Sequence, residues 1–301
     1  MTGMRNRTAL VIIAALIGLP VVVAGIEAAR FFAVNRPSDT LVSSGETREY
    51  ILHVPPSYDP NRPTPLVITI HGASIWPAAQ QALSQWDRVA DREGFIVAYP
   101  GGRSGRGPRH FGADDVTFIA DVIESIQRTH NIDRARIYAN GLSNGGGLSF
   151  LLSCTMPDRI AAVGLVAAAH LFEWRLCKDL RPVPMIAFHG TADDAALYEG
   201  GRSWVVSIPF PSIPNVTARW ARRNQCAPTP VESRVALDVT RIEYPMCSNN
   251  APVVLYKING GGHTWPGGRD LPEWFAGRTT QTIDASSVMW EFFKDHPLAK
   301  N

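Results

Sequence analysis

The sequence has no block of like charge. Among its 301 residues, 29 lysines and arginines nearly balance 27 aspartates and glutamates, and the basic residues are scattered singly. The formal net charge is +2, which gives no field strong enough to attract a polyanion. The composition therefore argues against a nucleic-acid partner.

Cysteine is scarce, and its spacing does not fit a metal site. The four cysteines include no Cys-x-x-Cys pair and no close Cys/His grouping, so we expect no metal and no other cofactor. Four cysteines permit three pairings, and their two-by-two clustering favours two short bridges, with four buried free thiols as the alternative. The favoured pairs are Cys154–Cys177 and Cys226–Cys247.

The chain also lacks internal repeats and low-complexity tracts. Its 301 residues are enough for one catalytic α/β domain of roughly 250 residues with a large core. Residues 31–46 are polar and carry proline, glycine and several serines, which is typical of a linker. We therefore place the domain at residues 47–301.

An apolar run near the N-terminus indicates export. Arg5 and Arg7 precede apolar residues from about 8 to 26, so residues 1–30 are interpreted as an export signal or a signal anchor. The run exceeds the roughly 7–15 residues of a cleaved signal and approaches the roughly 20 that cross a bilayer. Cleavage after Gly25 or Ala29 and retention as an anchor both stay open. We expect a secreted, periplasmic or outward-facing anchored protein, with a membrane partner only through an uncleaved anchor.

From residue 50 onward, short β-branched runs alternate with stretches of helical periodicity. Strands are expected at 50–54 (an edge strand), 66–70, 95–99, 136–139, 161–167, 185–188 and 253–258, and helices at 80–93, 114–129, 148–156 and 286–294. This alternation predicts an α/β fold with right-handed crossovers and a mainly parallel central sheet covered by helices on both faces.

The sharpest local motif is Gly141-Leu-Ser-Asn-Gly145, between an expected strand and an expected helix. It matches the G-x-S-x-G nucleophile elbow of the α/β-hydrolase fold, in which glycines permit the strained turn that exposes the serine hydroxyl. Ser143 is the predicted nucleophile, and a plain glycine-serine loop is the alternative. The helix N-terminus and the backbone N–H of Asn144 would then face the developing oxyanion.

A second oxyanion donor is expected after the strand at 66–70. This strand runs into His71-Gly72-Ala73, and in this fold the corresponding loop supplies a backbone N–H to the oxyanion hole. Ala73 is the candidate donor. His71 could be mistaken for the catalytic base, but it precedes the serine, whereas this fold expects serine, acid and histidine in that order. A structural role for His71 is favoured.

The acid is expected just past the strand at 185–188. Asp193 follows this strand, on the rim that the elbow would share, and Asp194 is the alternative. His189 falls inside the strand pattern and is interpreted as structural.

The base candidate is His263, directly after the strand at 253–258. Glycines on both sides allow its loop to direct the imidazole toward the serine, and Trp265 offers an apolar wall, so Trp265 is assigned to substrate binding. Ser143, Asp193 and His263 occur in the order that this fold uses.

Further motifs make residues 45–297, approximately, resemble the polyhydroxybutyrate depolymerase and feruloyl esterase-like family of secreted esterases. They include Tyr50-Ile-Leu-His-Val-Pro-Pro-Ser-Tyr58, Asp114-Asp-Val-Thr-Phe118, His189-Gly-Thr-Ala-Asp193, Tyr198-Glu-Gly-Gly201, Gly261-Gly-His-Thr-Trp-Pro-Gly267 and Trp290-Glu-Phe-Phe293. The resemblance implies that Ser143, Asp193 and His263 form a catalytic triad and that Cys226 pairs with Cys247.

Two features set this chain apart from the family pattern. After Tyr99-Pro100 the family usually has a Trp-Asn pair, whereas this chain has a glycine- and arginine-rich stretch at 101–110, which we expect to border the acyl pocket. There is also no separate polymer-binding module, which predicts poor attack on solid polyester.

The leading functional hypothesis is a serine carboxylic-ester hydrolase. Its expected substrates are small or oligomeric esters, either short polyhydroxyalkanoate oligomers or acyl and feruloyl esters of polysaccharide. A peptidase of the same fold and a catalytically silent envelope binding module are the alternatives, since a fold does not by itself prove activity.

Overall fold

The structure, a computed structural model, describes residues 38–103, 110–177, 181–203 and 209–299. The predicted export signal at residues 1–30 lies outside these ranges. The described residues all fall in one unit, residues 37–301. Across these ranges, no helix combines the length and the apolar character needed to cross a membrane.

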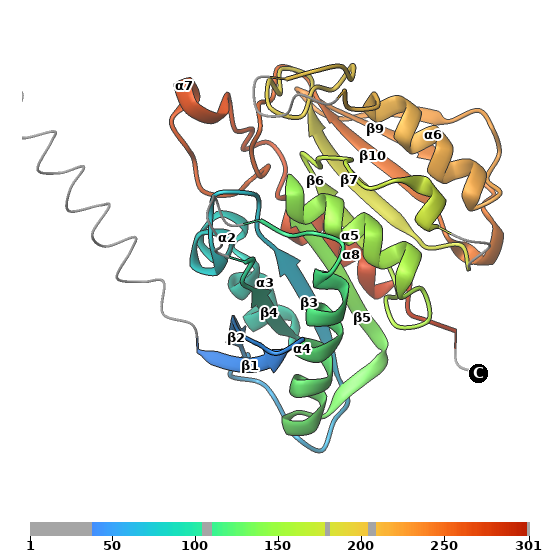
Figure 1. Ribbon diagram of the computed structural model, residues 1–301. Coiled ribbons are helices and arrows are strands. Elements are labelled where there is room, and N and C mark those ends of the chain that lie inside the picture. The colour runs from blue at the N-terminus through green and yellow to red at the C-terminus, as the bar shows by residue number, and fades with distance from the viewer. Residues whose placement is uncertain (1–37, 104–109, 178–180, 204–208, 300–301) are drawn as a thin grey trace, which may run out of the picture. The chain divides into compact units, whose positions relative to one another are not determined.

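The described strands form one mixed sheet (Figure 1). Their spatial order is β1 (Asp39–Ser43), β2 (Glu46–His53), β4 (Ile96–Pro100), β3 (Thr64–Ile70), β5 (Ile132–Leu142), β6 (Val163–Val166), β7 (Met185–Gly190), β10 (Val253–Ile258), β9 (Val239–Tyr244) and β8 (Val231–Ala236). In this order the neighbouring strands from β4 to β10 are parallel to each other. The outer strands, β1 and β2 on one side and β9 and β8 on the other, pair antiparallel with their neighbours.

Helices cover both faces of the sheet (Figure 1). One face carries α4 (Asp115–Thr129), α5 (Asn144–Thr155) and α6 (Ile213–Arg223), and the other carries α2 (Pro77–Ser84), α3 (Trp86–Glu93) and α8 (Ala285–Lys294). Each face has its own apolar core, with Phe118, Leu151 and Trp220 in one and Trp86 and Phe293 in the other. All seven residues of β3 are buried, as expected for a strand covered on both faces. The predicted α/β fold is confirmed.

The N-terminal boundary of the domain was predicted wrongly. Part of the supposed linker at 31–46 is β1, which pairs antiparallel with β2, and so the sheet begins at residue 39 rather than after 47. Its shortness, its half-exposed residues and the turn at Ser44-Gly45, where both residues have positive φ, resemble a linker when the segment is considered by itself. Consequently, the strand predicted at 50–54 is not an edge strand, because β1 and β4 flank β2.

The helix predicted at 80–93 is two helices. The chain turns at Gln85, which has left-handed φ and ψ angles of 53° and 30° and separates α2 from α3. No glycine or proline marks this break, so the periodicity suggested one helix. The strands β8 and β9, helix α6 and the short α7 (Glu273–Ala276) were not predicted either.

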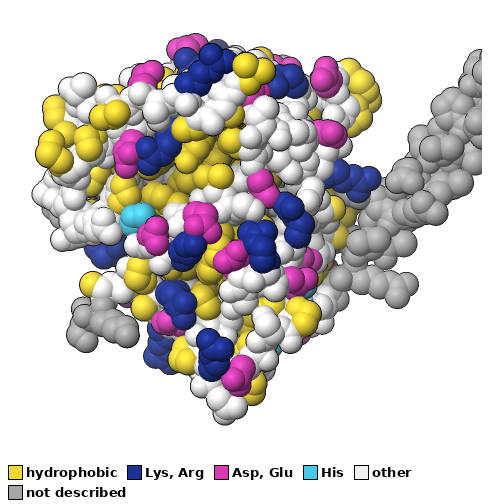
Figure 2. All heavy atoms as spheres, turned by 180° about the vertical axis from the view of Figure 1, so that it is seen from behind, with side chains coloured by type: hydrophobic (Ala, Val, Ile, Leu, Met, Phe, Trp, Pro, Cys, Tyr) yellow, Lys and Arg dark blue, Asp and Glu magenta, His cyan; other side chains and the backbone are white. Residues whose placement is uncertain are grey.

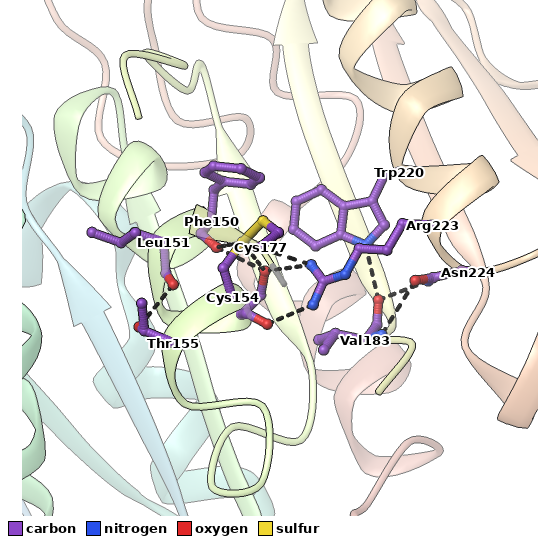
Figure 3. The surroundings of a disulfide bond; sticks show 10 residues. Phe150, Leu151, Cys154, Thr155, Cys177, Val183, Trp220, Arg223 and Asn224 are labelled. Carbon is purple, nitrogen blue, oxygen red and sulfur yellow. Dashed lines mark hydrogen bonds between the residues drawn. A yellow bond between two sulfur atoms is a disulfide. The ribbon is translucent and has the colours of Figure 1, made fainter. Parts of the chain in front are cut away.

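Both predicted disulfides are present, Cys154–Cys177 and Cys226–Cys247. Figure 3 shows the first, where the loop after β6 is tied to the last turn of α5. Beside it, α6 is fastened inward: Arg223 donates to the Ser153 carbonyl at 2.6 Å, and Asn224 donates to the Val183 carbonyl at 2.8 Å. The inner side of α6 is thereby fixed to both α5 and the start of β7.

The face shown in Figure 2 has an apolar hollow over the end of the sheet. It is a cavity of about 660 Å³ between β10 and α8, and its apolar lining includes Ile186, Val254, Tyr256, Val288 and Phe292. Ser143, Asp193 and His263 are not among its lining residues. The predicted site lies elsewhere, at the carboxyl ends of the parallel strands.

Candidate active site

The turn at Ser143 has the geometry of a nucleophile elbow. Ser143 lies between the end of β5 and the start of α5 with φ of 54° and ψ of −116°, a strained conformation for a residue with a side chain. Cβ atoms added at Gly141 and Gly145 would lie 2.5 Å from the Gly145 carbonyl carbon and 2.2 Å from the Ile70 oxygen. Only glycine fits at these two positions, which explains the motif.

Hydrogen bonds hold the main chain of Ser143 in place. Its N–H donates to the Val166 oxygen at 2.9 Å, and its carbonyl accepts from Gly147 at 3.0 Å and from Ala169 at 2.9 Å. The next N–H, that of Asn144, belongs to the first turn of α5 and therefore has no intrahelical acceptor. It is a donor that a developing oxyanion could use.

The loop after β3 passes directly beside Ser143. A Cβ added at Gly72 would lie 3.4 Å from Ser143 Cβ. Ala73, the next residue, is exposed, and so the structure brings the predicted second donor to the elbow.

His71 fixes the orientation of this loop. Its Nε2 accepts a hydrogen bond from the Gly102 N–H at 2.9 Å, and therefore its Nδ1 carries the proton and donates to the Gly72 oxygen at 2.7 Å. In a trans peptide the C=O and the following N–H point in opposite directions, so the N–H of Ala73 points away from the His71 ring. Both ring nitrogens are occupied, which leaves neither to take a proton from serine.

Both described ends of the stretch that departs from the family pattern are attached to the elbow region. The Asn144 side chain accepts from the Phe111 N–H at 2.7 Å and donates to the Phe111 oxygen at 3.1 Å. At the other end, Gly102 is bonded to His71, whose ring also lies 4.7 Å from that of Phe111. Residues 104–109 lie outside the described ranges. The stretch begins and ends beside the predicted nucleophile.

The loops after β7 and β10 bring Asp193 and His263 together. His263 Nδ1 lies 2.8 Å from Asp193 Oδ2. Because a carboxylate can only accept, Nδ1 carries the proton and Nε2 is left as the basic nitrogen. Asp193 is buried, whereas the His263 side chain is 19% exposed.

Three further donors hold the Asp193 carboxylate. Its Oδ1 accepts from the N–H groups of Ala195 and Ala196 at 3.0 and 2.7 Å. His189 Nε2 lies 3.4 Å from Oδ2 and 2.6 Å from the Ala196 oxygen, so it is a donor. Burial acts to raise the pKa of Asp193, but the hydrogen bonds with His189 and His263 outweigh burial and hold this pKa well below its usual range. The carboxylate stays ionised.

The positions of Asp194 and Trp265 bear on two assignments made from the sequence. Asp194 is exposed, whereas Asp193 is the residue bonded to His263. The assignment of Trp265 to substrate binding is wrong for this structure, because Trp265 is 2% exposed and its Nε1 donates to Ser286 Oγ at 3.0 Å. Trp265 belongs to the core under α8.

The predicted triad residues follow strands that end at one edge of the sheet. β5, β7 and β10 are parallel members of the same sheet, and so Ser143, Asp193 and His263 come to its carboxyl edge. Among the described residues, no hydrogen bond joins Ser143 Oγ to His263, and such bonds often tighten only when substrate binds. Nor does any group of His, Cys, Asp and Glu side chains in these ranges fit a metal ion.

Sequence reasoning did not anticipate how α7 lies next to the His263 loop. Gly262 donates to the Arg278 oxygen at 3.0 Å, and a Cβ at Gly262 would lie 2.2 Å from the Ala276 oxygen. On α7, Trp274 and Phe275 are 86% and 62% exposed. Adjacent aromatics in a turn between proline and glycine are the signal that could have indicated this exposed pair.

Comparisons with known proteins find similarity to esterases. Residues 48–174 match the family model described as esterase PHB depolymerase. The chain is 34% identical over 233 residues to feruloyl esterase B of Piromyces equi, which covers 72% of this chain and 42% of that protein. It is 27% identical over 274 residues to feruloyl esterase D of Neurospora crassa, which covers 86% of both chains.

The fold comparison points the same way. The acetyl xylan esterase from Aspergillus awamori superposes with a TM-score of 0.57 at 15% identity, over 82% of this chain and 94% of that one, which shows the α/β-hydrolase fold. The chain spans less than half the length of the Piromyces relative. Over residues 48–174 the chain is thus similar to the polyhydroxybutyrate depolymerase esterases, its relatives are named esterases, and its fold is that of the α/β-hydrolases.

Proposed function

We propose that this protein is a serine carboxylic-ester hydrolase that works through an acyl-enzyme. The observation that carries the proposal is the 2.8 Å hydrogen bond between buried Asp193 and His263, at the same sheet edge as the strained Ser143. Similarity to known esterases supports it, because the relatives carry esterase names.

In the first half-reaction, Ser143 Oγ attacks the ester carbonyl carbon while His263 Nε2 takes the hydroxyl proton. Asp193 holds the imidazole in the required tautomer and stabilises the imidazolium that forms. The carbonyl oxygen becomes an oxyanion, which the N–H groups of Ala73 and Asn144 stabilise. The intermediate then breaks its bond to the alcohol oxygen, which receives the proton from His263.

In the second half-reaction, water attacks the acyl group on Ser143. His263 Nε2 takes a proton from the water, and the same two N–H groups stabilise the second oxyanion. Release of Ser143 Oγ with the proton from His263 yields the carboxylic acid and regenerates the enzyme.

We propose short polyhydroxyalkanoate oligomers, or acyl and feruloyl esters of polysaccharide, as substrates. The family description and the names of the relatives support these two classes. The exposed pair Trp274 and Phe275, beside the His263 loop, would provide an aromatic surface for such substrates.

The test is hydrolysis of p-nitrophenyl acetate, p-nitrophenyl butyrate and a feruloyl ester by the full chain, with Ser143→Ala as control. The wild type should hydrolyse at least one ester, and the alanine variant should lose that activity. A serine-directed fluorophosphonate probe should label the wild type and not Ser143→Ala. An unlabelled and inert wild type would favour a silent binding module, whereas labelling without ester turnover would favour a peptidase.

We also propose that the protein is exported. The two disulfides support this proposal, because such bonds persist mainly in oxidising compartments. Peptide mass spectrometry of the N-terminus should show either cleavage after Gly25 or Ala29 or an intact anchor in the membrane fraction. Recovery of the intact chain in the cytoplasm with reduced cysteines would contradict export.

A further inference from the structure

A second cavity, of about 610 Å³, lies between the loop after β6 and helix α6. The loop contributes aromatic side chains, and α6 contributes cationic ones. Its lining includes His170, Phe172, Trp174, Val216, Arg219 and Arg222.

The loop that lines this cavity starts next to the predicted nucleophile. The loop is attached to the elbow, because the Ala169 N–H donates to the Ser143 carbonyl at 2.9 Å. Further along, the Phe172 ring lies 3.5 Å from where a Cβ would stand on Gly147. Gly147 is four residues after Ser143, which corresponds to about 6 Å along α5. A substrate held at Ser143 would have to extend along the first turn of α5, past Phe172, to reach the cavity.

The α6 side of the cavity carries two positive charges with no carboxylate partner among the described residues. Arg219 and Arg222 are exposed, and the only contact found for either guanidinium in those ranges is that of Arg219, 4.9 Å above the Trp174 ring. The one acidic residue of the lining, Glu173, is paired with Arg175. Arg223, in contrast, donates to Ser153, and Figure 3 shows its guanidinium directed toward the Cys154–Cys177 disulfide.

The aromatic side chains of the opposite wall are packed against the core. Trp174 packs against Phe150 and Trp220, with ring centroids 4.8 and 5.8 Å apart. Burial lowers the pKa of His170 to about 3, so its imidazole is neutral and adds no charge. The Trp174 ring covers one face of the Arg219 guanidinium, and the loss of water from that face strengthens its attraction for an anion.

We propose that this cavity is a subsite for a carboxylate carried by the ester substrate. The inference rests on the esterase function proposed above and narrows its substrates to esters with an acidic group. Guanidinium groups bind carboxylates through paired N–H donors, and Trp174 and Phe172 can contact the apolar part next to the acid. Two sources share this chemistry, the free acid end of a hydroxyalkanoate oligomer and a uronic acid on a polysaccharide.

The test compares kcat/KM for charged and neutral members of two substrate pairs with the full chain. One pair is the linear dimer of 3-hydroxybutyrate and its terminal primary amide, and the other is an acetylated xylo-oligosaccharide with and without a glucuronate branch. We expect one pair to show a charged-to-neutral ratio of about three to ten, as two partly exposed ion pairs would give. The pair that shows it identifies the source, and high salt should reduce the ratio.

The variant Arg219→Gln/Arg222→Gln should bring this ratio to about one. The control Arg128→Gln/Arg134→Gln removes the same charge from exposed positions at the opposite edge of the sheet, at the end of α4 and the start of β5, and should keep the wild-type ratio. The ratio is measured within one protein, so a general loss of activity does not imitate the effect.

A wild-type ratio of about one in both pairs, with hydrolysis that depends on Ser143, would overturn the subsite and leave the esterase proposal intact. If no ester is hydrolysed, the esterase proposal fails, and calorimetry with glutarate decides the subsite separately. Glutarate should bind Ser143→Ala at least threefold more tightly than Ser143→Ala/Arg219→Gln/Arg222→Gln. Equal binding, or none to either protein, would overturn it.

Discussion

Replacing Asp193 with asparagine tests the assignment of Asp193 as the catalytic carboxylate, because the change should move the His263 ring proton from one nitrogen to the other. The N–H groups of Ala195 and Ala196 both point at Oδ1, so the amide oxygen of the new side chain must take this position. The amide NH₂ group is then forced toward His263 Nδ1, which must accept instead of donate. His263 would carry its proton on Nε2, the nitrogen that has to receive the proton of Ser143.

The expected loss follows from this change of tautomer. In serine hydrolases an acid-to-amide change of this kind costs up to about 10⁴ in kcat, so we expect a fall of about 10³–10⁴, equivalent to about 4–5.5 kcal/mol. The fold should persist, since the side chain keeps its shape. The assay is kcat for p-nitrophenyl butyrate, together with the thermal midpoint of each protein.

Asp194→Asn is the matched control, because it makes the same chemical change at the adjacent, exposed carboxylate. Its kcat should stay within about twofold of the wild type, as for most surface substitutions away from a site. A folded Asp193→Asn enzyme that keeps more than about a tenth of the wild-type kcat would refute the tautomer argument. An equal loss in Asp194→Asn would refute the choice of acid.

Three further predictions concern the loop, the pH dependence and the disulfides. His71→Phe keeps a ring beside Phe111 but removes the hydrogen bond to the Gly72 oxygen, which frees the peptide that carries the Ala73 N–H. The kcat for p-nitrophenyl acetate should fall by up to about 10², with KM changed much less. An unchanged kcat would contradict the positioning role of His71. Burial raises the pKa of Asp238, but bonds from Thr282 and Arg278 outweigh it and lower this pKa to about 2, below the unfolded value of about 3.9. The ionised carboxylate therefore stabilises the fold fully above about pH 5, and this stabilisation is lost as the pH falls toward 2. The difference in thermal midpoint between the wild type and Asp238→Asn should become smaller as the pH is lowered. A difference that does not change with pH would disprove the linkage. Cys226→Ser/Cys247→Ser opens a bridge with a sequence separation of 21 and should lower the free energy of unfolding in urea by about 3 kcal/mol, whereas a loss below about 1 kcal/mol would contradict the chain-entropy account.

Sequence patterns located the parts of the fold whose cause is local. The strand at 66–70 is recognisable because β3 is buried on both faces and needs apolar residues throughout. The elbow is recognisable because backbone contacts at Gly141 and Gly145 admit no side chain. In both cases the constraint acts on the same residues that display the pattern.

The parts that were missed depend on distant partners. β8 is an exposed edge strand with a nearly continuous exposed pattern, so its residues show no alternation, and pairing with β9 defines it. Trp265 follows His263 by two residues and was expected beside it, but the indole finds its hydrogen bond at Ser286 and its packing under α8. The contact of His189 with Asp193 likewise depends on the turn after β7, which spacing alone does not reveal.

The anchoring of the stretch at 101–110 affects how such an enzyme could diversify. His71 and Asn144 hold Gly102 and Phe111 through backbone N–H and C=O groups, which every residue except proline offers in full. Apart from Arg103, whose side chain pairs with Glu46, the amino acids between these two anchors can therefore be exchanged without removing these hydrogen bonds. Since the sequence predicts that this stretch borders the acyl pocket, a new acyl preference would be able to arise there while the proton-transfer residues remain untouched, which makes the segment a target for directed evolution of substrate range.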